Sequence, residues 1–152
     1  KRRQEILGRP GGVTLIEDFA HHPTAVKETI RTVQEQFPGR TVFSVFEARS
    51  ATSRRNVFQN EYADAFSGAQ RVLFPPPFNQ TGIPEAERFS IEKLISDVRA
   101  KGVTVDLKEN VDAIVSTLAR EAKAGDAILI MSNGGFDGIY QKLITALETR
   151  GH

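Results

Sequence analysis

Hydrophobic and polar positions alternate along the chain in a pattern that predicts strands and helices in turn. Two strand-like runs, residues 2–7 and 13–18, flank a connector rich in glycine and proline, which predicts a β-hairpin with one antiparallel strand. A helix is expected to begin at Pro23, because apolar residues then recur at steps of three and four. The buried stripe of that helix would consist of Val26, Ile30, Val33 and Phe37.

The remainder of the chain continues the same alternation. Four further β-branched or apolar runs predict strands at residues 41–46, 71–74, 103–107 and 127–131. Helical spacing is seen between them and after the last: from Val57 to Phe66, after the expected caps Ser90 and Asn110, and from Ile139 to Leu147. The run 127–131 is the most apolar, so we expect it in the centre of the sheet.

About six strands and five helices in this order predict an α/β fold. Helices that connect parallel strands cover both faces of the sheet, so we expect a Rossmann-like three-layer domain, mostly parallel with one antiparallel strand. The chain of 152 residues has the length of one domain. A long loop is expected at residues 75–89, and long loops in compact domains are often functional.

Composition excludes several classes of function. The net charge of +1 gives no general attraction for nucleic acid or an anionic membrane, so neither partner is expected. The absence of cysteine excludes disulfides, zinc–thiolate sites and cysteine nucleophiles. The longest apolar run, residues 127–131, is far shorter than a membrane span, and a cytoplasmic location is expected. Because the chain begins at Lys1 and not at methionine, we expect it to be a piece of a longer protein.

Three polar loops are expected at the carboxyl ends of strands, where α/β sheets bind ligands. The first, residues 18–23, places Asp18, His21 and His22 before a helix N-terminus, which favours an anion. The alternative is that Asp18 or His22 only caps the helix. A metal site is not expected, because the third histidine, His152, stands at the chain terminus.

The second and third loops carry arginines and glycines. Residues 47–55 include three arginines, whose planar guanidinium groups suit carboxylate or phosphate, although a solvated basic loop is the alternative. Residues 132–138 are rich in glycine, which allows backbone N–H groups to approach a ligand, or simply forms a tight turn. This loop matches neither the dinucleotide fingerprint nor the Walker A motif. No nucleophile–base pair stands out, so the chain does not carry a complete active site.

Together the three loops resemble the C-terminal domain of the Mur ligase family, which builds bacterial cell-wall precursors. Residues 15–25, Leu-Ile-Glu-Asp-Phe-Ala-His-His-Pro-Thr-Ala, resemble the start of that domain. Residues 46–58 and 130–136 are similar to the members that act on a tripeptide in peptidoglycan recycling. The resemblance covers essentially the whole chain, residues 1–152.

The resemblance implies a three-domain, ATP-dependent ligase of which this chain is the third domain. The full enzyme would join L-Ala-γ-D-Glu-meso-diaminopimelate to UDP-N-acetylmuramate, whose carboxylate is activated as an acyl phosphate and attacked by the tripeptide amine. ATP and Mg would be bound mainly by the central domain, and UDP-N-acetylmuramate by the other domains. The domain by itself is expected to be inactive and to have no catalytic residue of its own.

The resemblance also assigns residues by motif position. Two would contact the nucleotide: Arg3 and Asp18. Six would line the pocket of the incoming peptide: His21, His22, Arg49, Ser132, Asn133 and Gly134. Within this set, His22 and Arg49 would hold a substrate carboxylate. One position departs from the members that add L-alanine, since Thr52 stands where they have a second arginine, and Arg54 or Arg55 would serve instead.

Two alternatives stay open at this point. One is the domain of a ligase that adds L-alanine to UDP-N-acetylmuramate. The other is a free-standing Rossmann-like module that binds a small anion. A P-loop encoded upstream of Lys1 would favour a ligase, whereas a start codon directly before Lys1 would favour the free-standing module.

Overall fold

The structure is a computed structural model that describes residues 4–132 and 134–150. In this part of the chain, six strands and five α-helices alternate, with four short 3-10 turns between them. The strands are β1 (Glu5–Gly8), β2 (Thr14–Asp18), β3 (Val42–Phe46), β4 (Arg71–Phe74), β5 (Thr104–Leu107) and β6 (Ala127–Met131). The helices are α1 (Pro23–Gln36), α2 (Gln59–Ala65), α3 (Ile91–Ala100), α4 (Val111–Glu121) and α5 (Ile139–Thr149).

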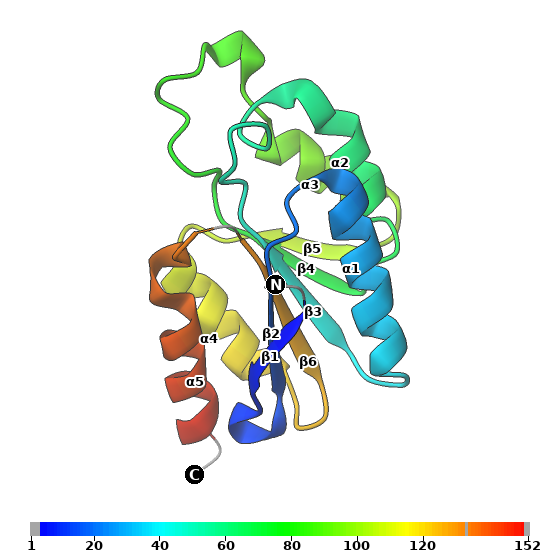
Figure 1. The fold of residues 1–152 in the computed structure, drawn as a ribbon, viewed down its shortest axis with the longest axis vertical. Coiled ribbons are helices and arrows are strands. Elements are labelled where there is room, and N and C mark those ends of the chain that lie inside the picture. Colours follow the sequence, from blue (N-terminus) through cyan, green and yellow to red (C-terminus); the bar gives the residue numbers. More distant parts are fainter. Residues whose placement is uncertain (1–3, 133, 151–152) are drawn as a thin grey trace.

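The strands form one sheet in the order β1-β2-β6-β3-β4-β5. Only β1 runs antiparallel to its neighbour, β2, and the other described pairs are parallel. Helices α1, α2 and α3 cover one face, and α4 and α5 cover the other (Figure 1). The predicted three-layer α/β fold, with one antiparallel strand, is therefore confirmed.

The path of the chain explains which helices lie on which face. From β2 the chain passes through β3 and β4 to β5, always in the same direction across the sheet, and then returns to β6 in the middle. Right-handed crossovers place the helices of the outward path on one face and the helix of the return on the other. The return therefore inserts β6 between β2 and β3.

Strand β6 separates two cores. Ala127, Leu129 and Met131 belong to the cluster beneath α1, α2 and α3, whereas Ile128 and Ile130 belong to the cluster beneath α4 and α5. Since side chains alternate between the faces of a strand, a strand covered on both faces must be apolar throughout. The predicted central position of residues 127–131 is confirmed.

Two local predictions differ from the structure. Val57 lies in a 3-10 turn, Asn56–Phe58, and is 61% exposed, so the prediction of a helix from Val57 was wrong. Phe58, not Val57, packs against the core beside α2. Phe37 is the C-cap of α1 and is only half-buried, because the helix ends at Gln36, one residue before it.

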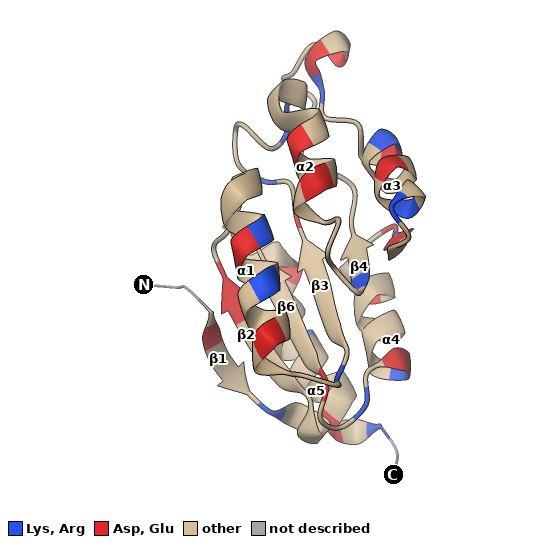
Figure 2. Ribbon diagram, turned by 90° about the vertical axis from the view of Figure 1, so that its right-hand side faces the viewer, with Lys and Arg blue, Asp and Glu red and all other residues tan. Residues whose placement is uncertain are grey.

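Acidic and basic residues share the same surfaces. On α1, Arg31 pairs with Glu28 and Glu35, so the helix carries both signs of charge (Figure 2). The ordered helices include none long and apolar enough to span a lipid bilayer, as far as the described residues go.

Candidate functional site

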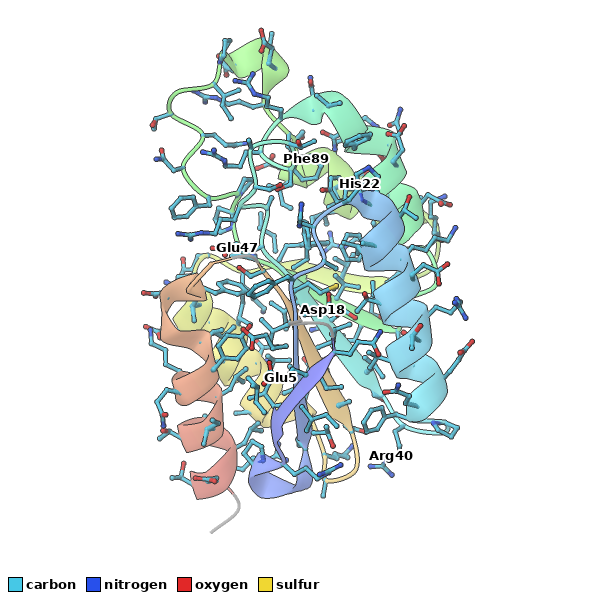
Figure 3. All side chains as sticks on the ribbon, in the orientation of Figure 1. Glu5, Asp18, His22, Arg40, Glu47 and Phe89 are labelled. Atoms are coloured by element: carbon cyan, nitrogen blue, oxygen red, sulfur yellow. The ribbon has the colours of Figure 1, made fainter. Side chains whose placement is uncertain are left out.

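The three polar loops meet at one end of the sheet. They follow β2, β6 and β3, which are adjacent in the sheet, so residues 18–23, 132–138 and 47–55 leave it side by side. The helices after β2 and β3 cover one face and the helix after β6 covers the other, an arrangement that opens a crevice beyond the strands. Figure 3 labels Asp18, His22 and Glu47 from these loops.

The Asp18 carboxylate organises the first loop. It is 1% exposed, and its two oxygens accept backbone N–H bonds, Oδ2 from Gln4 at 2.8 Å and Oδ1 from Ala20 at 2.7 Å. Gln4 has a φ of 54°, which few residues other than glycine adopt. Asp18 therefore connects the segment before β1 to the carboxyl end of β2.

His22 caps α1. Its Nδ1 accepts the N–H of Thr24 at 3.3 Å, and Pro23 fills the first helical position. Because Nδ1 acts as the acceptor, the neutral ring carries its proton on Nε2. His22 therefore caps the helix, and its exposed ring also presents an Nε2–H donor. The edge of the Phe58 ring packs against it with a centroid distance of 4.7 Å.

His21 is a structural part of the same loop. Its Nδ1 lies 3.0 Å from the carbonyl oxygen of Phe19, and its own carbonyl accepts a hydrogen bond from the Tyr62 hydroxyl. Burial raises the pKa of Tyr62, and a hydrogen bond with Ser53 opposes this. The Tyr62 phenol is therefore neutral and connects α2 to the first loop.

A hollow of about 210 Å³ opens at the first loop. It is lined by Asp18, Phe19, Ala20, His21, His22 and Ala25. The predicted residues Asp18, His21 and His22 thus share one surface depression. Phe19 is 42% exposed, which is unusual for a phenylalanine.

A buried carboxylate joins the second and third loops. Glu47 is 8% exposed, and its Oε1 accepts a hydrogen bond of 2.7 Å from the Ser132 hydroxyl. Ser132 Oγ in turn accepts the N–H of Gly134 at 3.2 Å. This chain of hydrogen bonds orients the start of the glycine-rich loop relative to the arginine loop.

Arg49 lies between an aromatic ring and a glycine backbone. Its Cζ is 3.7 Å from the centroid of the Phe78 ring, and its Nη1 is 3.7 Å from Glu47 Oε2. A Cβ added at Gly134 would lie 2.0 Å from Arg49 Nε, so the glycine backbone touches the guanidinium. Within the described residues, the Arg49 guanidinium donates no hydrogen bond that meets normal geometry, and its side chain is 31% exposed. Its donors are suited to a planar carboxylate.

The remaining arginines of the second loop are used elsewhere. Arg54 donates from Nη1 to the carbonyl of Asn79 at 2.9 Å, and Arg55 pairs with Glu87 at 2.7 Å. The hypothesis that one of them replaces the arginine absent at Thr52 gains no support from these contacts. Arg3 and Asn133 lie outside the described residues.

Glu47 and Phe78 are the site residues that sequence reasoning missed. The sequence places Glu47 in the second loop, and the structure shows that its carboxylate is buried. Phe78 stands in the long loop 75–89, where its 38% exposed ring meets Arg49. A polar residue directly after a buried strand is the sequence feature that points to Glu47. An apolar residue in an otherwise polar loop is the feature that points to Phe78.

A bound nucleotide would make limited contact with the described residues. Asp18 is covered, so a ribose hydroxyl would reach its carboxylate only if the segment around Gln4 moved away. Among the described residues, no group of three or more His, Cys, Asp or Glu side chains is arranged to hold a metal ion.

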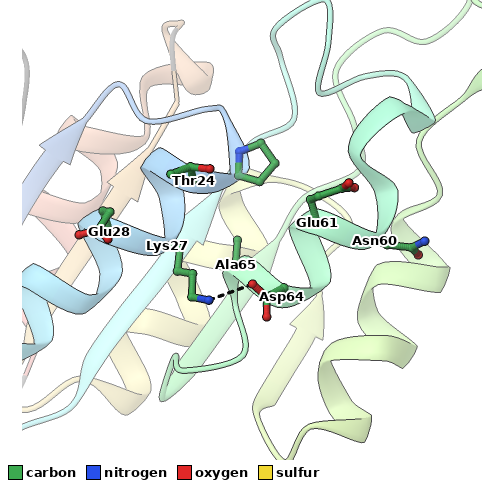
Figure 4. A pocket seen from close by; sticks show the side chains of 8 residues that line it. Thr24, Lys27, Glu28, Asn60, Glu61, Asp64 and Ala65 are labelled. Carbon is green, nitrogen blue, oxygen red and sulfur yellow. Dashed lines mark hydrogen bonds and ion pairs between the residues drawn. The ribbon is translucent and has the colours of Figure 1, made fainter.

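A larger groove, of about 490 Å³, lies between α1 and α2 (Figure 4). The ammonium of Lys27 crosses it to Asp64 at 2.9 Å, and both side chains are more than half exposed. These two charges pair with each other in solvent, so the groove offers no unpaired donors comparable to those of the partly buried Arg49 guanidinium.

Comparison with known proteins identifies the family. The model of the Mur ligase, glutamate ligase domain, matches residues 2–134. The chain belongs to the Mur ligase family. Over 99% of its length it is 33% identical to the UDP-N-acetylmuramate–L-alanyl-γ-D-glutamyl-meso-2,6-diaminoheptandioate ligase of Escherichia coli K12. This Mur ligase domain spans 31% of the length of that relative.

Solved Mur ligases have the same fold. A murein peptide ligase from Psychrobacter arcticus superposes with a TM-score of 0.82 at 33% identity, covering 100% of this chain and 31% of that one. A domain of a putative UDP-N-acetylmuramate:tripeptide ligase from Haemophilus ducreyi gives 0.70 at 31% identity, covering 95% and 99%. UDP-N-acetylmuramate–alanine ligases are also similar, and that of Desulfitobacterium hafniense is 26% identical over 95% of this chain and 32% of its own length.

Proposed function

We propose that this chain is the C-terminal, peptide-binding domain of an ATP-dependent ligase. The complete enzyme would join the tripeptide L-Ala-γ-D-Glu-meso-diaminopimelate to UDP-N-acetylmuramate in the cytoplasm during peptidoglycan recycling. The observation that carries the proposal is the pair of anion-directed donors, His22 Nε2–H and the Arg49 guanidinium, on the loops that follow β2 and β3, the strands on either side of β6. Relatives of 33% and 32% identity bear the name of this ligase.

The domain would contribute binding and orientation. The Arg49 guanidinium would hold a carboxylate of the tripeptide through paired N–H donors, and His22 would add a third donor from the N-terminus of α1. Ser132 and the backbone of the glycine-rich loop would form the opposite wall. Fixing the peptide in this way would place its free amine for attack on the activated carboxylate.

ATP and Mg would be held mainly by other domains of the enzyme. ATP supplies the phosphoryl group that activates the carboxylate of UDP-N-acetylmuramate, and phosphate leaves when the amide bond forms. Asp18, and Arg3 outside the described residues, would contact the nucleotide from this side. For Asp18 this requires the Gln4 segment to move, because the Gln4 N–H occupies Oδ2 of its carboxylate.

The test uses the full-length enzyme and measures ATP-dependent amide formation with tripeptide or L-alanine as the acceptor. We expect the tripeptide to be the preferred substrate. His22→Ala and Arg49→Ala should each raise the KM for the tripeptide by about tenfold or more, because each removes a charge-directed hydrogen bond. The KM for ATP should stay unchanged.

The outcomes separate the alternatives. Preference for L-alanine would identify the alanine-adding enzyme, four relatives of which are 26–29% identical to this chain. Activity with neither acceptor would overturn the proposal. Unchanged KM values in both variants would overturn the site assignment while leaving the ligase function intact.

A further inference from the structure

We propose that Phe78, in the long loop between β4 and α3, is a positioning residue for Arg49. Its ring holds the guanidinium in the orientation that receives a carboxylate of the incoming peptide. This inference rests on the proposed function, since it assigns to the 75–89 loop a role in substrate binding. Phe78 acts through Arg49 and is not itself a catalytic residue.

The contact between the two side chains carries the inference. The Cζ of Arg49 lies 3.7 Å from the centroid of the Phe78 ring, well within the range of a cation–π interaction. A guanidinium stacked on an aromatic face keeps its N–H donors free around its edge. The stacking therefore restrains Arg49 without using the groups that bind a carboxylate.

The other neighbours of Arg49 also restrain its guanidinium without accepting a hydrogen bond from it. Glu47 Oε2 attracts Nη1 from 3.7 Å, a distance too long for a hydrogen bond. The Glu47 carboxylate cannot swing closer without losing the bond that Oε1 accepts from Ser132 at 2.7 Å. Gly134 closes the side near Nε. The Phe78 ring, the Glu47 carboxylate and the Gly134 backbone thus restrict the orientation of the guanidinium. Within the described part of the chain, they take up none of its N–H donors.

Phe78 is itself fixed to the second loop. Its backbone N–H donates to the carbonyl of Ala48 at 3.0 Å, beside the buried Glu47. The next residues are also held, since Arg54 donates to the Asn79 carbonyl and Gln80 donates to the Arg54 carbonyl at 2.8 Å. The loop therefore presents Phe78 at a defined place above Arg49 (its path is the long excursion before α3 in Figure 1).

The exposure of Phe78 supports a functional role. The ring remains 38% exposed, so burial alone does not explain its position. By contrast, Phe74 and Phe89 at the two ends of the same stretch of chain are 0% and 2% exposed. The Phe78 ring instead covers one face of the Arg49 guanidinium.

The test compares Phe78→Leu with Phe78→Tyr in the full-length ligase. We expect Phe78→Leu to raise the KM for the tripeptide about three- to tenfold, the size of a lost cation–π contact, with kcat and the KM for ATP unchanged. Phe78→Tyr keeps an aromatic face and should restore the wild-type KM. Leu107→Ala is the matched control, because Leu107 is 39% exposed at the end of β5.

A spectroscopic measurement reports the contact directly. In the full-length protein with ¹⁵N-labelled arginine, the Nε–Hε resonance of Arg49, assigned with Arg49→Lys, should carry the ring-current shift of Phe78. It should move in Phe78→Leu and stay close to its original position in Phe78→Tyr.

A wild-type KM in Phe78→Leu, or an equal defect in Phe78→Tyr, overturns the inference. If the wild-type enzyme does not use the tripeptide at all, the proposed function fails. The Arg49 resonance then decides the positioning role alone, since an unmoved resonance in Phe78→Leu overturns it and a moved resonance supports it.

Discussion

At position 134 the absence of a side chain shapes the candidate site. A Cβ there would lie 2.0 Å from Nε and 2.3 Å from Cδ of Arg49, far inside normal contact distance. The backbone of Gly134 is not in the left-handed region, so alanine is conformationally allowed. The glycine is required by its neighbour and not by its own dihedral angles.

Gly134→Ala should therefore displace Arg49 and leave the fold intact. We expect the KM for the tripeptide to rise about tenfold, because the guanidinium loses its bound orientation. The midpoint of thermal unfolding should change little, since a flexible side chain moves and the backbone stays. Gly135→Ala is the matched control, as nothing lies within 4 Å of a Cβ at Gly135 and its φ is −72°. An equal effect of both substitutions would show that the contact with Arg49 is unimportant.

His22 caps α1 and, under the proposed function, also donates to a substrate carboxylate. One substitution can separate these two roles. Aspartate is a preferred N-cap but repels an anion, so His22→Asp should keep the free energy of unfolding within about 0.5 kcal/mol of the wild type. It should raise the KM for the tripeptide at least as much as His22→Ala. His22→Ala should lose the cap as well, at a cost of about 1 kcal/mol. Chemical denaturation and steady-state kinetics on the same samples check both effects, and a wild-type KM in His22→Asp would confine His22 to capping.

At the scale of elements, an ion cluster joins β4, β5 and α4. Arg71 is 8% exposed and makes a bidentate contact with Glu121, Nε to Oε1 at 2.9 Å and Nη2 to Oε2 at 3.1 Å. Its Nη2 also donates to Asp106 at 2.8 Å. The hydrogen bond from Arg71 lowers the pKa of Glu121 against the effect of burial. Burial tends to raise the pKa of Asp106, but Arg71 outweighs it and lowers that pKa too.

This cluster predicts a loss of stability in acid. Carboxyls whose pKa is lowered in the folded state stabilise the protein fully above their unfolded pKa, about 4, and lose this contribution as pH falls through the folded pKa. The free energy of unfolding should therefore decline from about pH 5 downward, and Arg71→Met should flatten this decline. Denaturation at several pH values checks it. Arg31→Met, in an ion cluster that is more than half exposed, should leave the slope unchanged, and an unaltered slope in Arg71→Met would contradict the prediction.

The elements themselves were largely predictable. Strand and helix positions agree with the hydrophobic pattern, and the expected caps Ser90 and Asn110 accept the N–H groups of Lys93 and Ala113. Such features depend on residues within about one helical turn. The error at Val57 has the same origin, because the pattern could not tell which of two adjacent apolar residues, Val57 or Phe58, would find the core.

At the scale of the whole molecule, the chain covers 31% of the length of each of two tripeptide ligases that it resembles. The domain lacks a P-loop, so we expect the 152-residue chain alone to form no amide product with ATP, UDP-N-acetylmuramate and tripeptide. Mass spectrometry of the products checks this, with circular dichroism as the control for folding and the full-length enzyme as the positive control. Product formation by the isolated chain would contradict the proposal that ATP and Mg are held mainly by other domains of the enzyme.

The sequence by itself determined the order of the elements, the α/β class and the three loops that carry the candidate chemistry. These follow from local periodicity and from the few conformations available to glycine, proline and helix caps. Only the tertiary structure decided that β6 lies between β2 and β3, that Glu47 meets Ser132, and that Phe78 stacks on Arg49. The reason is physical: such contacts join residues far apart in the chain, and they exist only once the crossovers have set the order of the strands.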